Sequence, residues 1–180
     1  MTVLAGPFAI ATVVLALGGA LKAFEPADTA NALRALRLPS GRALVRVGGV
    51  FELGLGVAAL GTGATVLAVL VGVSYIVFAV VVLVALESGR PISSCGCLGK
   101  VDTPPTWVHV TIDFVAAAVA AGAAVANDRE IALPEVLAKQ PLAGVPFVLL
   151  VVVGVALVFL AFSALPKTMA AVRALHHLAK

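Results

Sequence analysis

The chain has 180 residues, a net charge of +3 and a mean hydropathy of +1.15; 62% of its residues are hydrophobic and 12% are charged. A soluble domain would be about a quarter charged, and a globule of 18.1 kDa cannot bury this much apolar surface. The composition therefore excludes a soluble domain and indicates a protein that lies in a lipid bilayer. The basic residues flank apolar runs and form no separate patch, which excludes a nucleic-acid-binding protein.

The first apolar run, Val3 to Phe24, predicts a transmembrane helix, because a span needs about 20 apolar residues. It lacks a preceding basic region and a cleavage pattern, so we interpret it as a retained helix and not as a signal peptide. Glu25-Pro26 ends this helix. Asp28 to Leu38 follows, with Asp28 as its N-cap, and predicts a short helix on the membrane surface.

The second apolar run, Ala43 to Leu86, has twice the length of a span. Gly61-Thr62-Gly63 interrupts it, so the sequence predicts a helical hairpin of about 43–61 and 64–86. A polar loop from Glu87 to Pro105 follows this hairpin.

Two more apolar runs complete the chain. Thr106 to Ala126 predicts a fourth span with Trp107 as an interfacial anchor, and 142–165 predicts a fifth span without a charged residue. The segment between them, 127–141, is predicted to be a charged loop, and the tail, 166–180, an amphipathic helix on the membrane surface.

Together these elements predict an all-α integral membrane protein, with a four-helix transmembrane bundle, a fifth transmembrane helix and a C-terminal amphipathic helix. We divide the chain into a four-helix membrane domain (1–126), a loop (127–141), an accessory transmembrane helix (142–165) and a tail (166–180). Five spans place the first loop, the 87–105 loop and the tail on one side, where they carry ten of the 12 Lys and Arg. The positive-inside rule then predicts that the N-terminus lies outside and the 87–105 loop lies in the cytoplasm. We expect the membrane to be the inner membrane of a bacterial cell.

Cys95 and Cys97 are the only cysteines, separated by Gly96 within the 87–105 loop. A disulfide closed across one residue is strained, and a strained disulfide is more oxidising than a structural one. The pair therefore favours thiol exchange with a partner. Two thiols that only pack the loop are an alternative, as is half of a metal site, but the other soft ligands are three histidines and we predict no metal.

Glu52 lies within the second predicted span, where an ionisable side chain is costly and marks a candidate functional site. Gly48 and Gly56 lie four residues on either side, and this spacing predicts one helix face that another helix can approach closely. Lys22 ends the first span on the same side of the membrane and is the candidate partner of Glu52. The pair could serve chemistry or could only hold the two helices together.

His109 and Asp113 are four residues apart on the fourth span, so they share one helix face. A carboxylate beside an imidazole orients the ring, and the two could relay a proton to or from a thiolate or could act as a helix clamp. At a rise of 1.5 Å per residue, Glu52 and Asp113 lie roughly 9–14 Å below the membrane surface that carries the cysteines. We therefore expect a polar cluster beneath the thiol loop, which Tyr75 could also line.

Three segments have a pattern in common with one known family. They are Gly19 to Pro26 after the first span, Glu52 to Gly56 in the second, and Cys95 to Gly99 before a helix that begins near Trp107. With these segments the chain resembles the MauE/DoxX family of redox-associated membrane proteins over about residues 12–126. The resemblance implies a four-helix membrane bundle that assists disulfide formation or reduction in partner proteins, often with a thioredoxin-like companion.

These observations predict a membrane thiol–disulfide redox protein, which as an enzyme would be an oxidoreductase. Electrons would pass to a thioredoxin-like or other membrane partner protein or to a quinone, and no bound cofactor is expected. The alternative is a non-catalytic structural or accessory subunit of a larger membrane complex, docked through the fifth helix and the tail. A small-solute transporter is disfavoured, because paired broken helices are not evident. The predicted site residues are Cys95, Cys97, Glu52, His109, Asp113 and Lys22.

Overall fold

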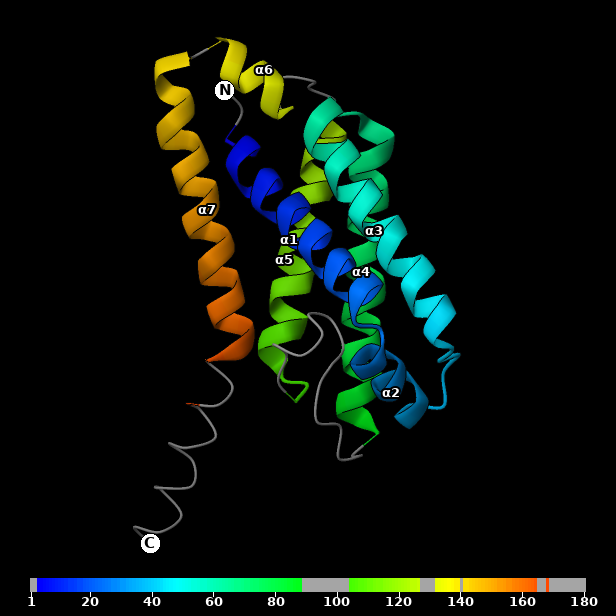
Figure 1. Cartoon of the computed structure of the whole chain (residues 1–180). Helices are drawn as coiled ribbons and strands as arrows, with labels where there is room; N and C mark the ends of the chain where they lie inside the picture. Colours follow the sequence, from blue (N-terminus) through cyan, green and yellow to red (C-terminus); the bar gives the residue numbers. More distant parts are fainter. Residues whose placement is uncertain (1–2, 89–103, 127–131, 140, 165–167, 169–180) are drawn as a thin grey trace, which may run out of the picture.

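The computed structural model describes residues 3–88, 104–126, 132–139, 141–164 and 168 (Figure 1). This part of the chain forms seven helices and no strand: α1 (Ala5–Phe24), α2 (Ala27–Ala35), α3 (Arg42–Thr62), α4 (Thr65–Glu87), α5 (Trp107–Ala126), α6 (Leu133–Lys139) and α7 (Pro141–Ser163). Five of the helices, α1, α3, α4, α5 and α7, are long and apolar enough to cross a membrane. The predicted all-α membrane fold is therefore confirmed.

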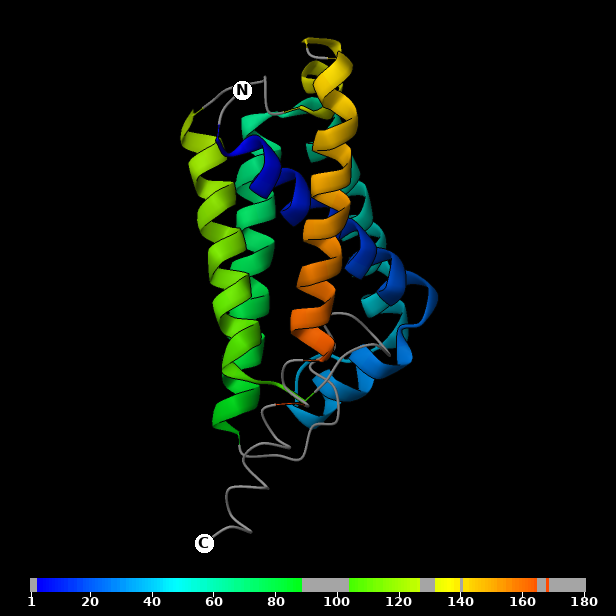
Figure 2. The same ribbon diagram turned by 90° about the vertical axis from the view of Figure 1, so that its left-hand side faces the viewer.

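The five long helices run up and down in chain order (Figures 1 and 2). The last residues of α1, α4 and α7 and the first residues of α3 and α5 lie at the same end of the molecule as α2. We call this end the α2 end. The short helix α6 lies at the opposite end, next to the first residues of α7. Cys95 and Cys97 lie outside the described residues, in the sequence between the ends of α4 and α5 that meet at the α2 end.

Close backbone approach defines the packing of α1 on α3. A Cβ atom on Gly19 would lie 2.5 Å from the backbone nitrogen of Leu53, and one on Gly49 would lie 2.6 Å from the carbonyl oxygen of Gly19. A Cβ atom on Gly56 would lie 2.6 Å from the carbonyl oxygen of Thr12. Such distances leave no room for a side chain, so these glycines set the spacing of the two helices, as small residues do in membrane bundles.

Small side chains also line the contact between α4 and α5. Gly72 of α4 faces Ala120 of α5, and the buried residue Ala117 lies beside them. The main apolar core joins α1, α3, α4 and α5 around these residues. The helix α7 packs on the outside of α1, where Gly154 receives the side chain of Ile10.

Both ends of α2 differ from the sequence prediction. The helix begins at Ala27 after Pro26, so Asp28 lies in its first turn and is not the N-cap. This helix ends at Ala35 and not at Leu38, because Arg37 has φ 60° and the amide of Leu38 donates to the carbonyl of Leu33, which closes the helix. The predicted turn at 61–63 is present, with Gly63 in the left-handed conformation (φ 59°) that ends α3.

The segment 127–141, predicted to be a loop, contains the helix α6. Ala132 and Val136 are buried in this region, and α6 contacts α3 and α7. Tertiary packing therefore stabilises a helix of 7 residues that would be too short to form alone. The tail 166–180 lies outside the described residues except for Thr168, so its predicted amphipathic helix stays a prediction.

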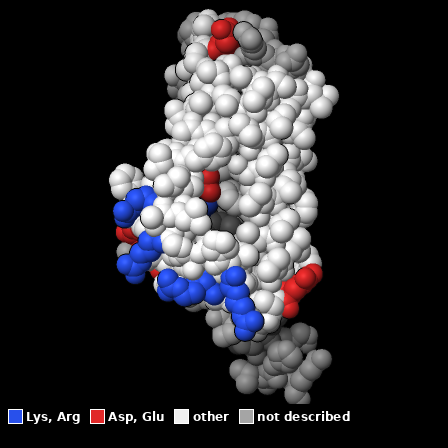
Figure 3. All heavy atoms as spheres, turned by 90° about the vertical axis from the view of Figure 1, so that its right-hand side faces the viewer, with Lys and Arg blue, Asp and Glu red and all other residues white. Residues whose placement is uncertain are grey.

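The described basic side chains gather at the α2 end. Figure 3 shows Lys and Arg side chains around this end, whereas the long flank above them is almost free of charge. The bases come from the last turns of α1 and α2, from the turn after α2 and from the first residues of α3: Lys22, Arg34, Arg37, Arg42 and Arg46. An uncharged flank with a basic end agrees with the charge distribution of a membrane-spanning bundle.

Candidate functional site

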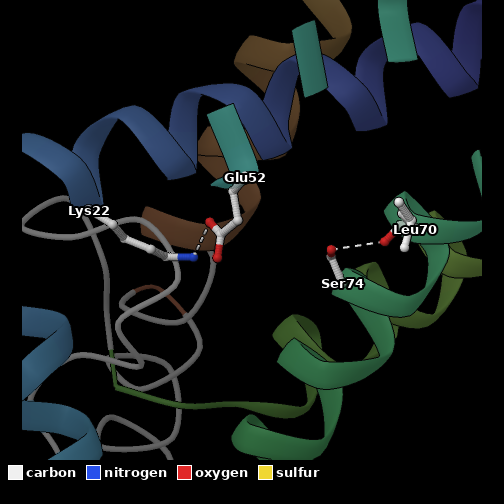
Figure 4. A network of polar contacts seen from close by, with 4 residues as sticks. All are labelled: Lys22, Glu52, Leu70 and Ser74. Carbon is white, nitrogen blue, oxygen red and sulfur yellow. Dashed lines mark hydrogen bonds and ion pairs between the residues drawn. The ribbon is translucent and has the colours of Figure 1, made fainter. Parts of the chain in front are cut away.

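An ion pair between α1 and α3 forms the centre of the site. The ammonium nitrogen of Lys22 lies 2.7 Å from Oε2 of Glu52, and the two side chains are only 6% and 13% exposed. Figure 4 shows the two side chains pointing toward one another from facing helices. The predicted pairing of Lys22 with Glu52 is thus present, and it neutralises two charges within the apolar part of the bundle.

The glycines that bring α1 close to α3 lie directly beside this pair. A Cβ atom on Gly19 would be 2.8 Å from Cβ of Glu52, and one on Gly49 would be 2.9 Å from Cβ of Lys22. The sequence spacing placed Gly48 at this contact, but a Cβ atom on Gly48 would meet nothing within 4 Å, so that prediction is wrong. Helix geometry explains the difference, because the buried positions of α3 follow a spacing of three and four residues through Gly49 and Gly56.

An aromatic pair from α4 covers the lysine. The ammonium nitrogen of Lys22 lies 4.1 Å from the ring centroid of Phe78, a favourable cation–π distance. The edge of one ring meets the face of the other between Phe78 and Tyr75, with centroids 5.9 Å apart and an interplanar angle of 82°. The Tyr75 hydroxyl donates a hydrogen bond of 2.7 Å to the carbonyl oxygen of Ala11. Lys22 is therefore held from one side by a carboxylate and from another by an aromatic face.

α5 contributes His109 and Asp113, which are 0% and 1% exposed. The Nδ1 atom of His109 lies 2.9 Å from the hydroxyl oxygen of Thr106, within hydrogen-bond distance. The His109 ring also packs on Phe162 of α7, with ring centroids 4.9 Å apart and planes inclined by 49°. Two side chains on other parts of the chain therefore fix the orientation of the imidazole.

A small cavity connects α1, α3, α4, α5 and α7 at this point. Its volume is about 20 Å³, sufficient for about one water molecule. Three of the predicted site residues line it together, whereas His109 lies one helical turn from Asp113 and outside the lining. The lining residues are Val14, Leu15, Gly18, Lys22, Glu52, Tyr75, Phe78, Asp113 and Phe162. The cavity can hold a proton or a water molecule beside two carboxyl groups and an ammonium, but it is too small for an organic substrate.

The structure describes some of the predicted site residues and not others. Lys22, Glu52 and Asp113 share the cavity, whereas Cys95 and Cys97 fall outside the described residues. Among the residues that the structure describes, no group of three or more His, Cys, Asp and Glu side chains could hold a metal ion.

Sequence reasoning missed three residues of the site. Phe78 lies one turn from Tyr75 on α4, so helical spacing could have indicated it. Thr106 stands three residues before His109 at the start of α5, a spacing from which a hydroxyl can reach the ring. The sequence gives no such indication for Phe162, because α7 is apolar on every side.

Replacement of Tyr75 by Phe tests the hydrogen bond that ties α4 to α1. We expect Tyr75→Phe to lower the free energy of unfolding by about 0.5–1.5 kcal/mol, since it removes one buried hydrogen bond. Ser74→Ala is the matched control, because the Ser74 hydroxyl donates only to the Leu70 carbonyl of its own helix, 2.9 Å away (Figure 4). Reversible unfolding in mixed micelles measures both variants, and equal effects would contradict the role of Tyr75 as a link between helices.

The fold and the site define a multi-pass helical membrane protein with an ion pair and two further buried ionisable groups inside its bundle. The chain belongs to the MauE family: the family model described as methylamine utilisation protein MauE matches residues 1–126. No curated protein and no solved structure matches the chain. The resemblance found in the sequence is thus confirmed for MauE.

The region matched by the family model covers four of the five long helices. It ends with α5 and so contains the four helices α1, α3, α4 and α5, together with Lys22, Glu52, His109 and Asp113. The helix α7 lies beyond the match, yet its Phe162 lines the same cavity. The helix α7 therefore contributes an apolar side chain to the lining of this cavity.

Proposed function

We propose that this protein is a membrane thiol–disulfide redox protein in which Cys95 and Cys97 cycle between dithiol and disulfide. One observation carries the proposal: Lys22, Glu52 and Asp113 line one small cavity within the bundle. The thiol loop joins the ends of α4 and α5 at the α2 end of that bundle. Thiol exchange needs groups that take up and return protons, and buried carboxyl groups near a thiol loop can do so.

The proposed reaction is balanced by a partner. Oxidation of the Cys95–Cys97 dithiol forms one S–S bond and releases two electrons and two protons. A partner disulfide takes up both and becomes a dithiol, or a quinone takes up both and becomes a quinol. The reverse reaction begins when a partner thiolate attacks the Cys95–Cys97 disulfide and forms a mixed disulfide, which the second partner thiol resolves.

The buried groups have separate tasks in this proposal. Glu52 and Asp113 accept or return the two protons, and His109, oriented by Thr106 and Phe162, passes a proton between the loop and Asp113. Lys22 is paired with Glu52 in the state described. When Glu52 takes up a proton, the freed ammonium stabilises a nearby thiolate.

We further propose that the α2 end faces the cytoplasm of a bacterial cell, with the N-terminus outside and the protein in the inner membrane. The basic residues at this end support the orientation, since positively charged loops remain on the cytoplasmic side. A thioredoxin-like protein or another membrane protein would then meet the thiol loop at that surface. No cofactor needs to be bound for this exchange.

Thiol trapping tests the proposal. In Cys97→Ser the remaining Cys95 cannot close its own disulfide, so we expect it to hold a partner as a mixed disulfide that separates on reduction. The double variant Cys95→Ser/Cys97→Ser is the control and should capture nothing. Non-reducing gels followed by mass spectrometry identify the captured partner. Absence of a mixed disulfide under both oxidising and reducing conditions would exclude thiol exchange.

That negative result would favour the second candidate function, a non-catalytic accessory subunit of a larger membrane complex. The observation that favours it is the apolar outer face of α7, where Leu149, Leu150, Leu157 and Leu160 are exposed. Such a face can pack on lipid or on another spanning helix. In this case the Lys22–Glu52 pair would hold α1 on α3 and do no chemistry.

A further inference from the structure

We propose that Phe162 is a positioning residue that closes the α7 side of the small cavity beside Lys22, Glu52 and Asp113 and fixes the His109 ring. The inference deepens the proposed function and rests on it for its redox meaning, although closure of the cavity can be tested by itself. It assigns to α7, the helix beyond the family match, a specific task in the site.

The burial of Phe162 is unusual for its helix. Phe162 is 3% exposed, whereas Leu157 and Leu160, in the same part of α7, are 60% and 56% exposed. Most large side chains of α7 face outward, and α7 contacts α5 only at a few positions. Phe162 is therefore the large side chain that the last turns of α7 place inside the bundle.

Phe162 lies beside ionisable side chains in a cavity whose lining is otherwise mostly apolar. Its ring lines the cavity together with Lys22, Glu52 and Asp113, and it packs on His109 with ring centroids 4.9 Å apart. Figures 1 and 2 show α7 alongside α1 and α5, on the side of the bundle away from α3. An apolar ring at this place shields the carboxyl and imidazole groups from the bilayer on the α7 side.

Shielding has a chemical consequence. Within a cavity that holds about one water molecule, the removal of one aromatic ring would add space for several more. Water beside Glu52 and Asp113 would then exchange their protons without passing through His109. Phe162 thus keeps the route of the protons confined to His109 and the ionisable groups that line the cavity, and it keeps the imidazole in one orientation.

A hydrophobic carbodiimide, N,N′-dicyclohexylcarbodiimide, reads out this closure, because it adds to protonated carboxyl groups that it can reach and leaves a stable acylurea. We expect Phe162→Ala in the full chain to raise the rate of labelling at Asp113, which is 1% exposed, several-fold, measured by mass spectrometry. Glu52, whose side chain is 13% exposed, is already reachable in the wild type, so its labelling should change less. Phe162→Leu fills most of the space and should label at nearly the wild-type rate. Leu160→Ala, an exposed position two residues away, should not change the rate.

Two measurements keep the test decisive. Glu135 on α6 is exposed and far from the cavity, so its labelling should stay constant; a rise there would indicate general unfolding. Phe162→Val removes less volume and replaces the alanine variant should that variant be recovered unfolded. Equal labelling in wild type and Phe162→Ala, or an equal rise in Leu160→Ala, would overturn the proposal. Mixed-disulfide capture in Cys97→Ser is independent of this result, so failure of closure and failure of thiol exchange are distinguished.

Discussion

Gly49→Ala is expected to lower the free energy of unfolding by about 1–3 kcal/mol, the usual cost of an added methyl group in a tightly packed contact. The new Cβ atom would lie 2.6 Å from the carbonyl oxygen of Gly19 and 2.7 Å from the amide nitrogen of Ala23. Both atoms belong to the backbone of α1, so no side chain can move aside. The helices α1 and α3 would have to separate along their whole contact.

Gly48→Ala is the matched control, one residue earlier on the same helix. A Cβ atom there meets nothing within 4 Å, and alanine favours a helix over glycine by about 1 kcal/mol. The control should therefore be neutral or more stable than wild type. Reversible unfolding in mixed micelles, followed by circular dichroism, measures both variants. Equal stabilities of Gly48→Ala and Gly49→Ala would show that α1 and α3 do not approach as closely as described.

The same pair of glycines shows where sequence reasoning reaches its limit. The span and its Glu52 are evident from composition, because a long apolar run with one carboxylate has few interpretations. The choice between Gly48 and Gly49 is not evident, because a spacing of four residues is only one of the two spacings that keep a helix face in register. The partner helix decides the register, and α1 contacts Gly49.

Long-range contacts account for the other site residues that were missed. The Lys22–Glu52 pair could be predicted because two opposite charges at similar depth inside a bilayer need one another. Phe162 could not, since α7 is apolar on every side and no periodicity distinguishes the face that enters the bundle. The helix α6 was interpreted as a loop for a related reason: its charged neighbours dominate the sequence, whereas buried Ala132 and Val136 support the helix only through contacts with other elements.

The site also explains why an intramembrane ion pair can be retained in so apolar a chain. Lys22 has a carboxylate at 2.7 Å and an aromatic face at 4.1 Å, so its charge is compensated from two directions. The same contacts would hold the bundle together whether or not chemistry takes place. Stability and function must therefore be separated by substitutions that remove both charges at once.

Loss of one charge alone is expected to be severe. Glu52→Leu leaves the Lys22 ammonium buried and unpaired, and Lys22→Met does the same to the Glu52 carboxylate. Removal of one partner of a buried ion pair costs about 3–5 kcal/mol, so each single variant should unfold at a much lower denaturant concentration than wild type. Arg42→Met is the control, because Arg42 is an exposed base at the same end of the bundle, and its effect should stay within about 0.5 kcal/mol.

The double variant Lys22→Met/Glu52→Leu separates the two roles of the pair. Replacement of both charges by apolar side chains removes the unpaired group, so we expect stability to return to within about 1 kcal/mol of wild type. Partner capture by Cys97→Ser in this background should nevertheless be slowed, because the proton acceptor and the ammonium are both gone. A double variant that is stable and captures its partner at the wild-type rate would contradict a chemical role for the pair and leave it only the task of holding α1 against α3.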